Sequence, residues 1–347
     1  MRTAAQMGAS GALSTSRGWA ALGQEVVVNI FFAGAGGAVG GRLVPILVAA
    51  GHRVTASTRT RSKMDALRAA GAEPVMLDGL QRDAVMDAVA AVRPDAIVHQ
   101  MTALAGVRDF KNFDDSFALT NRLRVEGTSH LLAAARAAGA RRFVAQSYTG
   151  WPNAREGGQV KTEEDPLDPH PPRQMNRTIN AIRQLEAMVS GAPDLTGIVL
   201  RYGSLYGPAT SLGRDGDVTR LVQRRMFPII GGGTGVWSFT HVEDAARVAA
   251  LAVEGGPAGV YNAVDDEPAE VSVWLPEFAR AIGAPPPWRV PAWLGRALAG
   301  DVVVSMMTTV RGSSNAKAKR VLGWQLRYPS WRVGFSEGLG PSDAPRS

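Results

Sequence analysis

Short runs of β-branched and apolar residues alternate with alanine-rich segments through the first 200 residues, and this alternation restricts the fold more than any other feature. It is typical of parallel strands joined by crossover helices, and continuous apolar strands indicate that both sheet faces are covered. The expected strands are residues 26–33, 52–58, 73–78, 95–101, 141–147 and 196–202. The expected helices are residues 38–50, 61–71, 81–92, 114–138 and 176–191. The pattern predicts an α/β fold with a doubly wound parallel sheet of the Rossmann type.

The periodicity becomes looser in the second half of the chain, which contains a glycine-rich turn and a proline-rich region. We expect residues 26–206 to form the dinucleotide-binding domain, and residues 238–264 to return to it. Residues 207–237 and 265–338 are expected to form a smaller, partly interleaved C-terminal α/β cap that binds the substrate. Residues 1–25 are small and polar without the apolar run of a secretory signal, so we expect a disordered extension, with a transit peptide as the alternative.

Glycines with the spacing G-x-x-G-x-x-G directly follow the first expected strand and open the next helix. In this place glycines permit a tight turn and a close approach of the backbone to a pyrophosphate, and the helix N-terminus supplies N–H groups. A glycine-rich turn in a glycine-rich protein is the simpler alternative, but the position favours dinucleotide binding. The residues expected to contact the dinucleotide here are Gly34, Gly36, Gly37, Ala38, Val39 and Gly40.

The end of the second strand indicates which dinucleotide would bind. A site for NAD has an Asp or Glu here that holds the ribose 2′-hydroxyl, but no acidic residue lies between Gly41 and Met64. Arg59 stands there instead, followed by Arg61 and Lys63, so we predict that NADP is the cofactor and that NADPH is preferred over NADH. The alternative is a solvated, basic start of a helix.

Asp78 and Gly79 end the third expected strand. This is the usual place for a contact with the adenine, and an aspartate that only shapes the turn after the strand is the alternative.

Composition excludes several classes of protein. There is no cysteine, which excludes disulfides and cysteine-ligated metal sites and is consistent with a cytoplasmic location. The formal net charge is +7, but the basic residues are scattered, so we expect no nucleic-acid partner. No apolar run of membrane-spanning length occurs, and we expect no membrane partner. The expected partner is a small-molecule substrate, with a homodimer as a possible assembly; no metal site is expected.

Several segments occur in an order and spacing typical of one family. They are AGAGGAVG, IVHQMT, VEGTSHLLAAARAAGARRFVAQS, LRYGSLYGP, HVEDAAR, GVYNAVDDEP and SNAKAKRVLGW. Between about Val27 and Gly338 the chain resembles the extended short-chain dehydrogenase/reductases, the NAD(P)-dependent epimerase/dehydratase group, although Arg124 stands where the family usually has Asn. The resemblance implies a nicotinamide cofactor across the carboxyl ends of the strands. It also implies cofactor contacts at Met101, Thr102, Tyr202 and Ser204.

The resemblance further implies a catalytic serine and a Tyr-x-x-x-Lys pair on the helix after strand five. Ser147 aligns with the family serine, but no tyrosine of this chain is followed by lysine four residues later. The helix alignment places Thr178 at the tyrosine position and Ile182 at the lysine position. In the family the lysine lowers the pKa of the tyrosine and holds the nicotinamide ribose. We therefore expect an atypical member of the family.

Tyr148 is the candidate that could replace the missing tyrosine. A neutral phenol can donate a proton, so such a site would favour reduction over alcohol oxidation. Consecutive side chains of a strand point to opposite faces, so Tyr148 reaches the cleft beside Ser147 only if the chain has already turned.

Other polar residues are weaker candidates. Asn176 and Asn180 are neighbours on one helix face and could bind a substrate, as could Arg177, although a solvated helix arginine is the alternative. We expect His99 to be a packed residue at the end of a strand and His241 to contact the start of a helix.

These observations predict an NAD(P)-dependent oxidoreductase or an epimerase/dehydratase-like enzyme. With NADPH it would reduce a carbonyl or sugar-like small metabolite, using Ser147 and a non-standard proton donor. The alternatives are a non-redox nucleotide-binding or sensing protein and a cofactor-assisted isomerase on the same fold.

Overall fold

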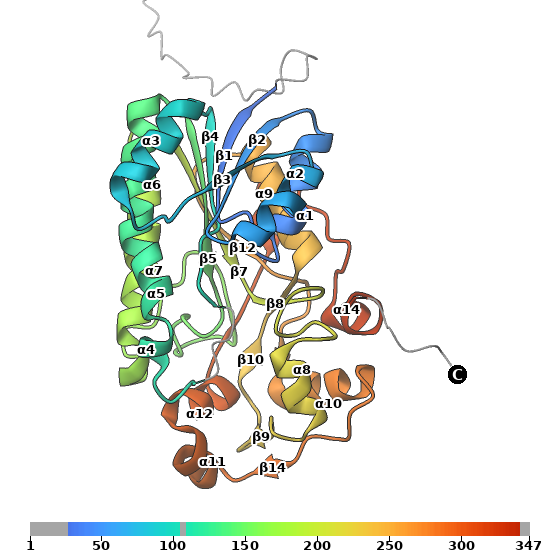
Figure 1. Cartoon of the computed structure of the whole chain (residues 1–347). Helices are drawn as coiled ribbons and strands as arrows, with labels where there is room; N and C mark the ends of the chain where they lie inside the picture. The colour runs from blue at the N-terminus through green and yellow to red at the C-terminus, as the bar shows by residue number, and fades with distance from the viewer. Residues whose placement is uncertain (1–26, 105–108, 341–347) are drawn as a thin grey trace, which may run out of the picture.

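The computed structural model describes residues 27–104 and 109–340. Its centre is a sheet of seven strands that are all parallel (Figure 1). In spatial order the strands are β12 (Gly259–Ala263), β7 (Thr196–Tyr202), β5 (Arg142–Tyr148), β4 (Ala96–His99), β1 (Asn29–Ala33), β2 (Arg53–Thr58) and β3 (Glu73–Met76). The strand order reverses between β1 and β4, which opens a ligand crevice at the carboxyl ends of the strands.

Helices cover both faces of this sheet, as its apolar strands predict. One face packs against α1 (Gly40–Ala49), α2 (Met64–Ala69), α9 (Val242–Glu254) and α13 (Ala316–Leu322). The other face packs against α3 (Arg82–Val92), α6 (Thr128–Ala138) and α7 (Asn176–Ser190). Figure 1 shows the two helical layers on either side of the sheet. The structure thus has the predicted doubly wound α/β architecture.

The single helix expected over residues 114–138 is wrong, because this segment is divided. It consists of α4 (Phe113–Ser116), α5 (Ala118–Arg122), the π-helical turn η3 (Leu123–Gly127) and α6. The wider turn of a π-helix interrupts a regular helix and occurs often at functional sites. Here it contains Arg124, which is buried.

The rest of the chain forms a cap at the carboxyl ends of the strands (Figure 1). The helices of the cap are α8 (Asp217–Gln223), α10 (Val271–Ala281), α11 (Ala292–Ala299), α12 (Asp301–Thr308) and α14 (Trp331–Glu337). The short helices η2 (Arg61–Lys63) and η4 (Arg173–Met175) lie in connections of the sheet, directly before α2 and α7. Short strands pair as β6 (Val160–Lys161) with β15 (Gly312–Ser313), β8 (Ser204–Tyr206) with β11 (Phe239–His241), β9 (Ile229–Ile230) with β14 (Arg289–Val290), and β10 (Val236–Trp237) with β13 (Ala269–Glu270).

An aromatic cluster holds the cap together. Phe239, Trp274, Phe278, Trp331 and Phe335 are buried and contact one another, mostly edge to face. Such pairs stabilise a core beyond the apolar area that they bury. The cap therefore has a core of its own beside the two cores of the sheet.

None of the helices in the described ranges is long and apolar enough to cross a membrane. Within those same ranges no group of three or more His, Asp or Glu side chains could hold a metal ion.

Candidate functional site

The glycine loop between β1 and α1 requires its glycines for different reasons. Gly34 has a φ of 88°, and a Cβ there would lie 2.7 Å from the backbone nitrogen of Met101. A Cβ on Gly40 would collide with the carbonyl group of Ala35. A Cβ on Gly37, by contrast, would meet only the carbonyl oxygen of Gly34, at 3.7 Å. Gly34 and Gly40 thus serve the packing of the loop, whereas Gly37 borders open space.

The start of α1 leaves backbone donors beside this open space. The N–H groups of Ala38, Val39 and Gly40 have no acceptor among the residues that the structure describes, and no side chain caps the helix. Unpaired N–H groups at a helix N-terminus are a binding site for a phosphate group. The loop and helix start therefore fit the pyrophosphate of a dinucleotide.

The end of β2 carries positive charge and no carboxylate. The last residue of the strand, Thr58, is buried, and Arg59, Arg61 and Lys63 are exposed beyond it. The ammonium group of Lys63 donates a hydrogen bond of 2.5 Å to the carbonyl oxygen of Gly36 in the glycine loop. Lys63 is thus next to the glycine loop, and a contact of Arg59 with a 2′-phosphate stays a prediction.

The ends of β3 and β4 lie close to the same loop. Asp78 is half-buried, and its carboxylate accepts a hydrogen bond of 3.1 Å from the N–H of Leu80, so it shapes the turn. Gly79 is packed under the Met101 side chain, because a Cβ there would collide with the Met101 sulfur. Thr102 is half-buried just after Met101. These positions adjoin the crevice, and their contact with a cofactor stays a prediction.

The structure separates Ser147 from Tyr148. The two residues are consecutive at the end of β5, and their side chains point to opposite faces of the strand. The Ser147 hydroxyl is buried, at 2% exposure, and donates a hydrogen bond of 2.7 Å to Glu186 of α7. The Tyr148 hydroxyl lies 3.0 Å from the Ser204 hydroxyl, toward the cap. The side chain of Ser147, the predicted catalytic serine, therefore points away from the cap, and the side chain of Tyr148 points toward the cap.

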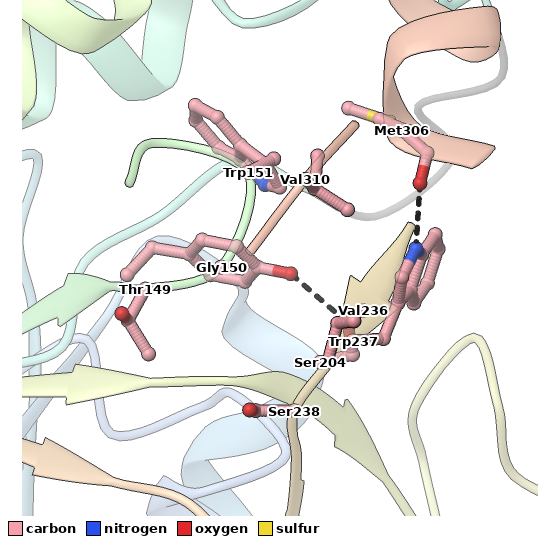
Figure 2. A pocket seen from close by; sticks show the side chains of 10 residues that line it. Thr149, Gly150, Trp151, Ser204, Val236, Trp237, Ser238, Met306 and Val310 are labelled. Atoms are coloured by element: carbon pink, nitrogen blue, oxygen red, sulfur yellow. Dashed lines mark hydrogen bonds between the residues drawn. The ribbon is translucent and has the colours of Figure 1, made fainter. Parts of the chain in front are cut away.

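Tyr148 and Ser204 line a narrow pocket between the carboxyl ends of β5 and β7 and the cap (Figure 2). Its volume of ≈ 20 Å³ has room for about one water molecule. Trp151 stacks on Tyr148 with ring centroids 5.1 Å apart, and the indole N–H of Trp237 donates to the carbonyl oxygen of Met306. The remaining lining residues are Thr149, Gly150, Val236, Ser238 and Val310. The pocket combines four residues that carry hydroxyl groups (Tyr148, Thr149, Ser204 and Ser238) with aromatic walls.

Burial raises the pKa of the Tyr148 phenol above its usual value, and hydrogen bonds to Ser204 and Trp151 and the charge of Arg124 oppose that rise. The phenol is therefore protonated at neutral pH. It can donate a proton but does not act as a base.

Two buried residues, Thr178 and Ile182, occupy the positions where the family has the Tyr-Lys pair. Thr178 is fully buried, and both its backbone N–H and its hydroxyl donate to the Asp114 carboxylate, at 2.8 and 2.6 Å. Ile182 is buried in an apolar cluster. Neither residue offers a proton donor to the pocket.

Four residues that were predicted to contact the cofactor or the substrate do not line the pocket at Tyr148. The Tyr202 hydroxyl is inside the core, where it accepts from Gln100 and donates to the carbonyl oxygen of Ala245, so Tyr202 offers no side-chain contact to a cofactor. Asn176, Arg177 and Asn180 are exposed on the outer face of α7. The inner face of α7 holds Thr178 and Ile182 instead, and substrate binding by the three exposed residues stays a prediction.

Asn176 and Arg177 line a separate open depression of ≈ 580 Å³ near α4. There the guanidinium group of Arg177 contacts Asp115 at 2.5 Å. Asn180 accepts a hydrogen bond from Arg183. None of the three lines the pocket at Tyr148.

His99 and His241, the two histidines considered from the sequence, have structural roles. His99 is buried, and its burial lowers its pKa to about 4, so it is neutral at physiological pH. Nδ1 of His241 accepts from the backbone N–H of Glu243 and caps α9, and its Nε2 donates to the carbonyl oxygen of Gly338.

Several pocket residues were not anticipated from the sequence. Trp237, Met306 and Val310 belong to the cap and are far from β5 in the sequence. Tertiary packing brings them to the pocket, so no local sequence motif marks them. Arg124 did carry a signal, since a cation replaces the usual family Asn at this position.

Comparisons with known proteins agree with this architecture. The model of the NAD dependent epimerase/dehydratase family matches residues 30–263. A 3-diazoavenalumate denitrifying reductase of a Streptomyces species is 46% identical over 310 residues, which cover 89% of this chain and 99% of the relative. The 4-hydroxy-2-methyl-3-oxo-4-farnesyl-3,4-dihydroquinoline-1-oxide ketoreductase of Stigmatella aurantiaca is 27% identical over 251 residues, 72% of this chain and 71% of that protein.

A solved structure has the same fold. The UDP-glucose 4-epimerase of Thermus thermophilus, in complex with NAD, superposes with a TM-score of 0.69 at 21% identity and covers 89% of this chain and 97% of that one. The match to the family model extends over more than half of the chain, and the denitrifying reductase is similar over nearly its whole length. The chain therefore belongs to the NAD dependent epimerase/dehydratase family.

Proposed function

We propose that this protein is an NADPH-dependent reductase that removes the nitrogen of a small diazo compound. The observation that carries the proposal is the 46% identity to a denitrifying reductase named for a diazo substrate, over 99% of that protein. The glycine loop and the free N–H groups of α1 would hold the pyrophosphate of the cofactor, and Arg59 and Lys63 its 2′-phosphate. A bound reduced nicotinamide supplies a hydride.

The lost Tyr-Lys pair supports this reaction class. When an aryl diazonium cation accepts a hydride, the carbon–nitrogen bond breaks, dinitrogen leaves and no proton is consumed. Reduction of a carbonyl group to an alcohol consumes a hydride and a proton, and the proton is normally supplied by a general acid. Because Thr178 and Ile182 leave the acid position without a donor, the site suits an acceptor that needs only hydride.

The residues around the pocket suit a planar substrate, although the pocket itself has room for only about one water molecule, so the proposal requires the cap to move away from β5 when the substrate binds. Trp151 and Trp237 provide aromatic surfaces, and the hydroxyl groups of Tyr148 and Ser204 provide hydrogen bonds between them. Aromatic walls with a few polar groups are typical of pockets that bind small planar molecules. These residues would orient the substrate and exclude water.

The test uses the purified protein, NADPH deuterated at C4 and an aryl diazonium salt. The proposal predicts that one dinitrogen is released for each NADPH oxidised and that deuterium appears at the carbon that carried the nitrogen. Since diazonium ions also accept hydride spontaneously, the rate without protein is subtracted. NADPH oxidation without dinitrogen, or product without deuterium, would contradict the proposal.

Carbonyl reduction is the second candidate, and the Tyr148 hydroxyl in the pocket favours it. Like the Stigmatella ketoreductase, such an enzyme would reduce a ketone, with Tyr148 as the proton donor.

Tyr148→Phe distinguishes the two candidates. If the enzyme reduces carbonyl compounds with Tyr148 as general acid, kcat should fall about 100-fold, the low end of the usual contribution of such a group. If the acceptor needs only hydride, kcat should change little. Steady-state rates with a diazonium salt and with a panel of ketones measure this, and Ser204→Ala controls for loss of the hydrogen bond alone.

Arg59→Ala tests the cofactor preference. A hydrogen bond to a charged group contributes about 1.5–3 kcal/mol, so we expect binding of NADPH to weaken about tenfold or more and binding of NADH to stay the same. Titration calorimetry with both nucleotides measures this. Arg68→Ala removes another exposed arginine, which pairs with Asp65 on α2, and serves as the control. Equal or tighter binding of NADH by the unmodified protein would contradict the preference.

A further inference from the structure

The end of the cap that lies farthest from the sheet exposes several large apolar side chains. β9, β14 and α11 lie together at this end (Figure 1). Of the tryptophans that the structure describes, only Trp288 and Trp293 are exposed, at 60% and 70%. Met226 and Leu298 are exposed to a similar degree. A group of exposed apolar residues indicates an interaction surface, whereas a single one does not.

Contacts between the elements hold these residues at one place. The N–H of Ile229 donates a hydrogen bond of 2.8 Å to the carbonyl oxygen of Trp288, which joins β9 to β14. α11 packs on β9, because a Cβ on Gly295 would collide with the side chain of Ile230. The guanidinium carbon of Arg225 lies 5.9 Å from the centre of the Trp288 ring. We call this surface the cap tip, and its residues are Arg224, Arg225, Met226, Trp288, Arg289, Trp293 and Leu298.

The cap tip is basic. Residues 218–237 and 278–300, which contain it, include six arginines and no Asp or Glu. Three of these arginines pair with acidic residues that lie just outside the two segments. The arginines whose side chains are exposed and form no ion pair within the described ranges are Arg224, Arg225 and Arg289.

Arg225 has a backbone conformation that is uncommon for its residue type. Its φ is 57°, in the left-handed region, just beyond the end of α8. Its N–H donates a hydrogen bond of 2.9 Å to the carbonyl oxygen of Val222 in the last turn of that helix. Glycine is the usual residue in this conformation after a helix. The arginine instead places a positive charge over Trp288 and joins charge and aromatic surface at the cap tip.

We propose that the cap tip docks on the surface of a bilayer that contains anionic phospholipids. Tryptophan side chains are enriched at the level of the headgroups, where Trp288 and Trp293 would lie, and the unpaired arginines would contact the phosphates. The protein would lie on the membrane without crossing it, which requires no spanning helix. The proposal differs from the sequence-based expectation of no membrane partner, which rested on the absence of an apolar run of spanning length.

A second copy of the chain fits the cap tip less well. In a symmetric dimer the same surface lies on both sides of the contact, so the unpaired arginines of one copy would face those of the other. A stable contact with another protein requires a broad complementary face, whereas the cap tip is a protruding end (Figure 1). The headgroup layer of an anionic bilayer has the opposite charge and can adapt to such an end.

Sedimentation with lipid vesicles tests the proposal. The purified protein is mixed with vesicles of phosphatidylcholine alone, or of phosphatidylcholine and phosphatidylglycerol in equal parts. We expect binding to the anionic vesicles, weaker binding to the neutral ones, and weaker binding at high salt. Anionic vesicles with brominated acyl chains should quench part of the tryptophan fluorescence, because Trp288 and Trp293 enter the interface. No substrate or cofactor is present, so the result is independent of the proposed reductase function.

Two variants separate the charged contacts from the apolar ones. Arg224→Gln/Arg225→Gln/Arg289→Gln should weaken binding to the anionic vesicles about 100-fold, because each arginine near such a surface contributes about fivefold. Trp288→Ala/Trp293→Ala should weaken binding about tenfold or more and remove the quenching by brominated lipid. Thermal melting shows whether each variant is folded, and either variant alone tests the proposal if the other does not fold.

Arg53→Gln/Arg93→Gln/Arg136→Gln is the matched control. These three arginines are exposed near the amino ends of the strands, on the side opposite the cap. The control lowers the net charge by the same amount as the arginine variant of the cap tip, and we expect it to bind the anionic vesicles like the unmodified protein. Equal weakening by both variants would overturn the proposal, because binding would then follow net charge alone.

Failure of the unmodified protein to bind anionic vesicles also overturns the proposal. Sedimentation velocity then distinguishes the other occupants of the cap tip. A dimer that Trp288→Ala/Trp293→Ala dissociates would assign the surface to a second copy of the chain. A monomer in both cases would leave an acidic protein as the partner.

Discussion

Gly37→Val is expected to weaken binding of the nicotinamide cofactor by about 1000-fold and to leave the fold intact. In this structure a Cβ on Gly37 would meet only the Gly34 carbonyl oxygen, so the protein itself tolerates a side chain there. The branched side chain would instead occupy the space beside the free N–H groups of Ala38 to Gly40, where the pyrophosphate belongs. Loss of two or three hydrogen bonds to a charged group, at about 1.5–3 kcal/mol each, accounts for the expected size.

Two other glycines of the same segment are controls for Gly37→Val. Gly40→Ala should lower stability, because its Cβ would collide with the Ala35 backbone. Gly41→Ala should bind the cofactor normally, since Gly41 has no atom near its Cβ position and is exposed. Fluorescence titration with NADPH and thermal melting separate the outcomes. Normal cofactor binding by a folded Gly37→Val protein would place the pyrophosphate elsewhere.

Arg201→Met is expected to lower the free energy of unfolding by about 3–5 kcal/mol. Arg201 and Glu186 form a two-pronged ion pair that is buried between β7 and α7, and removal of one partner leaves an uncompensated buried charge. The variant also leaves the Ser147 hydroxyl as the remaining partner of Glu186. Denaturant unfolding monitored by circular dichroism measures the change.

The double variant Glu186→Met/Arg201→Met should be more stable than Arg201→Met, because it removes the charge that the single variant leaves behind. Ser147→Ala removes a hydrogen bond and keeps the ion pair, so it should cost only about 1 kcal/mol. A double variant less stable than the single one would show that the ion pair does not account for the loss.

The sheet was largely predictable from the sequence, because its strands are continuous apolar runs and its connections contain glycines. The expected strand at residues 196–202 agrees with β7, and the strand ends elsewhere differ by a few residues. Membership of the family was also predictable and is confirmed by the match over residues 30–263. Most of the cap could not be predicted from the sequence. α10 contains Pro276, and α8, α11 and α14 are short helices in which apolar residues show no clear helical period.

The site was predictable only in part, because it depends on which way side chains point. The glycine loop is local, and three of its glycines could be assigned from spacing. Ser147 and Tyr148 are neighbours, and the sequence does not tell which of them faces the cap. Likewise, the alignment that placed Thr178 and Ile182 in the vacated positions did not show that Asn176, Arg177 and Asn180 face solvent. Tertiary packing decides each of these orientations.

The position of β12 and α9 after the first part of the cap affects how the protein is made. α9 covers α1, and β12 completes the edge of the sheet beside β7, yet both leave the ribosome after β8, α8 and β9. A nascent chain that ends before residue 242 therefore lacks α9, and the side of α1 that α9 contacts in the finished protein is uncovered. Because exposed apolar surface makes folding intermediates prone to aggregate, synthesis of this protein passes through a stage at which a chaperone that binds apolar segments would protect it.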